Sequence, residues 1–165
     1  MKSNIRKWLA VLITAVCYFI VHEGAHLAVA LILGIFEKAR FMGIGMQIVI
    51  DASKTTNIQL AVFNVAGSVA TLLAAYIFVI RTNSILLQKN EFIKVVCYYL
   101  TLGFLIADPL YLSLLCGFFC GGDMNGIILF GISEFVIRLI YAAIGIVNLY
   151  LFIRIIFPAY KKNFS

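Results

Sequence analysis

Long runs of apolar residues alternate with short polar stretches along the whole chain. The four runs cover approximately residues 8–34, 58–81, 92–119 and 124–157. A helix needs about 20 apolar residues to cross a bilayer, whereas a strand of an outer-membrane barrel shows only about 9 to 11 residues of alternating polarity. The pattern therefore predicts an all-α polytopic membrane protein, with four transmembrane helices in a single membrane-embedded domain, residues 1–165.

The segment 35–57, between the first two runs, differs from the rest of the chain. Charged residues flank Gly43 and Gly45, and the β-branched residues Ile48, Val49 and Ile50 follow. These features predict a short hairpin or re-entrant segment at the membrane surface. As a strand, this segment would offer an edge to an extended peptide, and a plain surface hairpin is the alternative.

Composition excludes several classes of protein. Of the 165 residues, 64% are hydrophobic and 12% charged, against about 45–50% and 25% in soluble domains. The net charge of +6 is spread over the segment ends without a basic block, which argues against nucleic acid as a partner. The four cysteines include no Cys-x-x-Cys pair, so we expect packing groups rather than a disulfide framework.

The basic residues also predict an orientation. The first apolar run is too long for a signal peptide and lacks a small-residue cleavage site, so we expect a retained helix. With four crossings, nine Lys and Arg lie on the side of the two termini and three on the other side. Because cytoplasmic loops retain basic residues, both termini are expected in the cytoplasm, in a multi-pass protein of a prokaryotic cell membrane.

The first apolar run contains both histidines of the chain, in the sequence His22-Glu23-Gly24-Ala25-His26. Ionisable groups at membrane depth are costly unless they are paired, solvated or bound to metal, so they indicate a functional site. Residues four apart share one helix face, which suits two imidazoles on a single zinc ion. Glu23 projects in an adjacent direction, where its carboxylate can act as a general base without being a ligand.

A catalytic zinc site needs a third protein ligand, and the later helices offer two aspartates. At 1.5 Å per residue, His22 lies about 21 Å along the first helix and Asp108 about 24 Å along the third. Depth therefore does not exclude Asp108. Asp123 is preferred because the glycines around it leave room for a metal and a substrate backbone. Glu134 is better explained by an ion pair with Arg138 one turn later.

Asn64 lies about six residues into the second helix, near the height of the histidines. Its amide could donate to the oxyanion or orient the substrate, and a hydrogen bond between helices is the favoured alternative. Gly67 and Ser68 are expected to serve close packing of helices. The tyrosines, Tyr111 among them, are expected to face lipid or the membrane interface rather than a binding site.

Three motifs together resemble the site-2 protease family of intramembrane zinc metalloproteases. They are His22 to His26 in a first helix, Asn64 followed by Ala66-Gly67-Ser68, and Gly121-Gly122-Asp123 before a later helix. The resemblance implies one zinc ion per chain, with His22, His26 and Asp123 as ligands and Glu23 as the base. The family's usual Asn-x-x-Pro-x-x-x-Leu-Asp-Gly motif is absent, which is typical of a compact, divergent member.

The expected function is hydrolysis of peptide bonds in or near the transmembrane segments of substrate proteins. The expected partners are that substrate, the lipid bilayer and a separate regulatory membrane protein. The alternative is a non-catalytic membrane protein of the same fold that binds metal or transmembrane segments. An intact Glu23 favours the enzyme, since a metal carrier needs the histidines but no base beside them.

Overall fold

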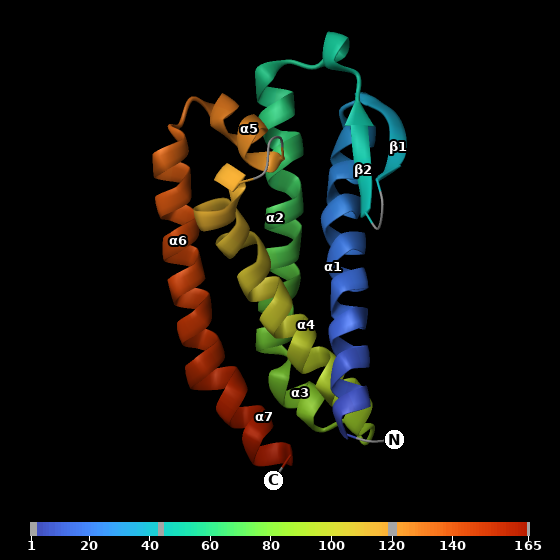
Figure 1. Cartoon of the computed structure of the whole chain (residues 1–165), viewed down its shortest axis with the longest axis vertical. Coiled ribbons are helices and arrows are strands. Elements are labelled where there is room, and N and C mark those ends of the chain that lie inside the picture. Colours follow the sequence, from blue (N-terminus) through green and yellow to red (C-terminus); the bar gives the residue numbers. More distant parts are fainter. Residues whose placement is uncertain (1–2, 43–44, 119–121, 165) are drawn as a thin grey trace.

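The computed structural model describes residues 3–42, 45–118 and 122–164, and it consists mainly of long helices (Figure 1). Within these residues, four helical segments are long and apolar enough to cross a membrane, in agreement with the prediction. They comprise Asn4–Ile32, Asn57–Ile80, Glu91–Phe118 and Glu134–Asn163.

Helix α1 (Ser3–Ile32) ends where the backbone turns into the predicted hairpin. The amide of Ile35 donates to the carbonyl of Ala30, and that of Gly34 to the carbonyl of Leu31. Bonds of this kind satisfy carbonyls left free at a helix end and turn the chain out of the helix. The helix therefore stops two residues before the predicted bound at residue 34.

Strands β1 (Phe36–Met42) and β2 (Gly45–Ile50) form an antiparallel pair, so the predicted hairpin is confirmed. The pair lies alongside α1 (Figure 1). Ile48 of β2 is buried in one cluster with Ala30, Ile35 and Phe63. This cluster joins the hairpin to α1 and to α2.

Helix α2 (Asn57–Ile80) follows the short helix η1 (Ala52–Lys54). It begins with a capping box in which the side chains of Thr56 and Gln59 satisfy free amides of the first turn. It packs against both α1 and α4. The short helix α3 (Thr82–Leu86) then leads to α4.

Helix α4 (Glu91–Leu110) contains Pro109 in its last turn. Proline has no amide hydrogen, so the carbonyl four residues earlier, that of Leu105, loses its helical donor. Asn148 on α6 replaces it, because its Nδ2 donates to that carbonyl at 2.8 Å. The chain continues as a π-helical turn, η2 (Tyr111–Leu115), and a short 3-10 helix, η3 (Cys116–Phe118).

The prediction of one continuous helix over 124–157 is wrong. The chain forms α5 (Asp123–Ile127), η4 (Ile128–Phe130) and then α6 (Glu134–Leu151). Gly131 has a φ of +80°, a left-handed conformation that ends a helix. Ser133 then caps α6 by accepting a hydrogen bond from the Val136 amide.

The end of this last segment also differs from the prediction. After α6, the π-helical turn η5 (Phe152–Ile156) leads into α7 (Phe157–Phe164). Pro158 therefore does not end the helical segment. It lies just after the π-helical turn η5, inside the continuous helical span Glu134–Asn163.

Both ends of the described chain lie at one end of the molecule, and α5 lies near the other end, beside α2 (Figure 1). This arrangement brings α5 close to the second half of α1, which carries the two histidines.

Candidate metal centre

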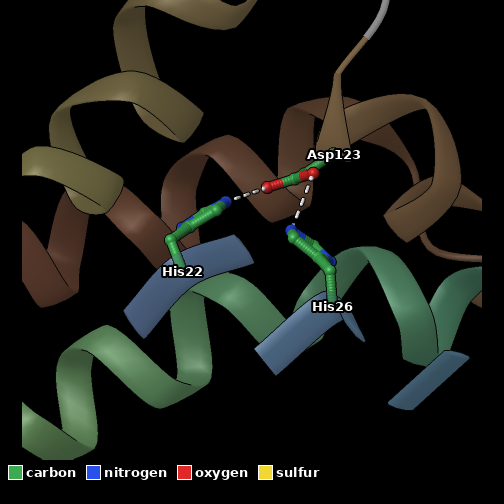
Figure 2. Close-up of side chains that lie close together, drawn as sticks. All are labelled: His22, His26 and Asp123. Carbon is green, nitrogen blue, oxygen red and sulfur yellow. Dashed lines mark hydrogen bonds and ion pairs between the residues drawn. The ribbon is translucent and has the colours of Figure 1, made fainter. Parts of the chain in front are cut away.

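His22 and His26 lie one turn apart on α1, and both are buried. They point toward Asp123, the first residue of α5 (Figure 2). Nε2 of His22 is 3.1 Å from Oδ2 of Asp123, and Nε2 of His26 is 3.5 Å from Oδ1. Among the described residues, these three form a group whose ligand atoms all lie within 4.8 Å of one another.

These distances suit a zinc ion. Bonds of about 2.0–2.1 Å in tetrahedral geometry separate two ligand atoms by about 3.3 Å. The two nitrogen-to-oxygen distances, 3.1 and 3.5 Å, lie on either side of this value. Two imidazoles and one carboxylate also match the donor set of catalytic zinc sites, which leave one position open.

Gly67 on α2 leaves space beside the two imidazoles. A Cβ atom at this position would lie 2.6 Å from Nε2 of His22 and 2.7 Å from Nε2 of His26. Any side chain here would push the two rings away. Gly67, which was predicted to serve close helix packing, therefore packs directly against the two candidate ligands.

Asp123 is held in its ionised form, as a metal ligand must be. Its side chain is only 15% exposed. Burial alone would raise the pKa of this carboxyl, but hydrogen bonds and attraction from the His22 and His26 imidazoles lower it to about 2.

The hydrogen bond at Nδ1 of His26 determines which nitrogen of this ring can bind a metal. Nδ1 lies 2.7 Å from the backbone carbonyl of Phe63. A carbonyl only accepts hydrogen bonds, so Nδ1 carries the hydrogen. When the ring is neutral, as a metal ligand must be, this leaves the lone pair on Nε2, which faces Asp123.

Asp108 lies on the other side of His22. Its Oδ1 is 3.3 Å from Nδ1 of His22, and the residue is fully buried. The predicted similarity in height is therefore correct, but Asp108 faces Nδ1, the ring nitrogen that points away from Asp123. In this structure Asp123 joins the two histidines and Asp108 does not.

Glu23 lies in a cleft of about 370 Å³ beside these residues. The cleft is lined by residues from α1, β2, α2, η2 and the start of α5: Tyr18, Phe19, His22, Glu23, His26, Gln47, Ile48, Phe63, Asn64, Tyr111, Gly122 and Asp123.

Asn64 is part of the cleft wall, as its predicted height suggested. Its Nδ2 donates to the Leu60 carbonyl of its own helix at 2.8 Å, so this amide bonds within α2 and not between helices as the favoured alternative expected. Tyr111 was predicted to face lipid or the interface, and this is wrong, because it lines the cleft from the π-helical turn after α4. Glu134 pairs with Arg138 at 2.6 Å, as predicted.

Two side chains near the centre, Tyr18 and Thr71, were not predicted from the sequence. Tyr18 precedes His22 by one helical turn, and that spacing is the only signal that points to it. Thr71 is one turn beyond Gly67, on the face of α2 that carries small residues. Both touch Asp108.

Comparison with known proteins adds no relative. No protein-family model matches the chain, and neither curated proteins nor solved structures give a significant match.

Proposed function

We propose that this chain is an intramembrane zinc metalloprotease similar to the site-2 protease family. The observation that carries the proposal is the convergence of His22, His26 and Asp123 beside Gly67. Three protein ligands of this kind are typical of catalytic zinc, whereas structural sites use four. In the proposed orientation both termini are cytoplasmic, and the site lies within the half of the bilayer farther from them.

Glu23 is the proposed general base. When bound, zinc would polarise the scissile carbonyl and make a water molecule more acidic. A carboxylate oxygen of Glu23 takes a proton from that water while the oxygen of the water bonds to the carbonyl carbon. The protonated Glu23 then gives this proton to the leaving amine nitrogen as the carbon–nitrogen bond breaks.

The hairpin supports a peptide as the substrate. Gln47 and Ile48 line the cleft together with Glu23. Peptide bonds in a helix are occupied by their own hydrogen bonds, so a substrate has to become extended before it is cut. A strand beside the site offers backbone groups to such a segment.

The decisive experiment compares the wild type with Glu23→Gln on a single-span reporter in proteoliposomes. Glu23→Gln should keep one zinc ion per chain and cut at least about 100-fold more slowly, since it removes the base but no ligand. Glu134→Gln is the matched control, because Glu134 pairs with Arg138 outside the cleft. It should keep the wild-type rate.

Two results would contradict the proposal. If Glu23→Gln cut the reporter at the wild-type rate, Glu23 would not be the general base. Absence of cleavage by the zinc-loaded wild type, across reporters of varied sequence, would favour the non-catalytic metal-binding protein. Zinc analysis of Asp123→Asn tests the ligand set separately, and the metal content should fall to near zero.

A further inference from the structure

Asp108 is a fully buried carboxylate inside the helix bundle, and two other helices supply hydroxyl groups to it. The hydroxyl of Tyr18, on α1, donates to Oδ1 at 2.7 Å, and that of Thr71, on α2, donates to Oδ2. A buried carboxylate is costly unless its oxygens are satisfied. Here both oxygens accept a hydrogen bond, so the surroundings are built to hold a carboxylate.

This carboxylate is aimed at one ring nitrogen of His22. The oxygen that Tyr18 bonds, Oδ1, is 3.3 Å from Nδ1. Tyr18 also stacks on the imidazole, with 5.4 Å between ring centroids and 28° between planes. Tyr18 therefore covers the face of the ring, Asp108 lies beside its edge at ion-pair distance, and Nε2 is left facing Asp123.

The two histidines thus have different neighbours at Nδ1, the nitrogen that faces away from Asp123. Nδ1 of His26 meets the neutral backbone carbonyl of Phe63, and Nδ1 of His22 meets a charged side chain. A carboxylate beyond a metal-bound imidazole orients the ring, keeps the hydrogen on Nδ1 and makes the other nitrogen a better donor.

We propose that Asp108, held by Tyr18 and Thr71, is a positioning residue of the metal centre, which fixes His22 for metal binding without being a ligand. This inference rests on the metal centre of the proposed function. It does not depend on whether the protein cuts peptides.

The test measures zinc dissociation constants by competition with a chromophoric chelator, on the purified full chain. Asp108→Asn and Thr71→Val should each weaken zinc binding by about 10- to 100-fold. Thr101→Val is the matched control: Thr101 is equally buried, and its hydroxyl bonds the Cys97 carbonyl of its own helix. It should keep the wild-type constant.

Cobalt spectroscopy separates positioning from ligation. At saturating Co²⁺, Asp108→Asn should keep one ion per chain and the visible absorption of the wild type, because the ligands are unchanged. A lost ion or an altered coordination spectrum would make Asp108 a ligand and overturn the inference. Wild-type zinc affinity in Asp108→Asn and Thr71→Val would overturn it as well, while the proposed protease would stand.

Discussion

At the scale of single residues, the most informative position is one without a side chain. Gly67 allows α2 to approach α1 so closely that the imidazoles of His22 and His26 occupy the space of its missing Cβ. Interiors are packed too tightly for such an overlap to be absorbed at no cost. The metal centre therefore depends on a residue that offers no ligand atom.

Gly67→Ala should consequently abolish stoichiometric zinc binding, because the added methyl group displaces the Nε2 atoms. Gly24→Ala is the control, since a Cβ there has nothing within 4 Å although Gly24 adjoins Glu23 in sequence. Zinc per chain, measured by elemental analysis on both purified variants, checks the expectation. Wild-type zinc content in Gly67→Ala would show that α1 and α2 pack less closely here than in this structure.

At the scale of helices, the interruption of α4 at Pro109 connects three elements. Asn148 on α6 donates to the Leu105 carbonyl that Pro109 leaves free, and it accepts a hydrogen bond from Tyr76 on α2. The π-helical turn after the proline carries Tyr111 into the cleft. The proline thus influences both the packing of the bundle and the wall of the site.

We expect Asn148→Ala to lower the free energy of unfolding by about 1–3 kcal/mol, because it leaves a buried carbonyl without a donor. In a Pro109→Ala background the cost should be smaller, since the new amide at position 109 can donate to Leu105. Unfolding in detergent mixtures, analysed as a double-mutant cycle, measures this coupling. Strictly additive effects would contradict the link between the two residues.

At the scale of the whole molecule, the two termini lie together and the hairpin lies toward the opposite end (Figure 1). Lys94, near the start of α4, donates to Glu91 of its own helix and to Asn163 of α7 at 2.9 Å each, so it ties the start of α4 to the C-terminal helix. An even number of membrane crossings places both termini on the same side of the membrane, in agreement with their position at one end of the molecule. The count of basic residues favours the proposed orientation across the membrane, in which both termini lie in the cytoplasm.

Cysteine labelling in cells tests this direction, in a background where the four native cysteines are replaced by alanine. A cysteine at position 54, after the hairpin, should react with an impermeant reagent in intact cells. A cysteine at position 162 should react only after permeabilisation. The opposite pattern would reverse the orientation and put the site near the cytoplasmic face.

The sequence by itself determined the four apolar helices, the hairpin and the pair of histidines on one helix face, because hydropathy and helical spacing are local properties. It also gave the height of Asp108 correctly, since rise per residue is constant. Only the tertiary structure decided that Asp123 faces the Nε2 atoms and that Asp108 faces Nδ1, because the direction of a side chain depends on how each helix is rotated against its neighbours. The proximity of Tyr18, Gly67 and Thr71 to the centre was likewise decided by packing between segments far apart in the chain.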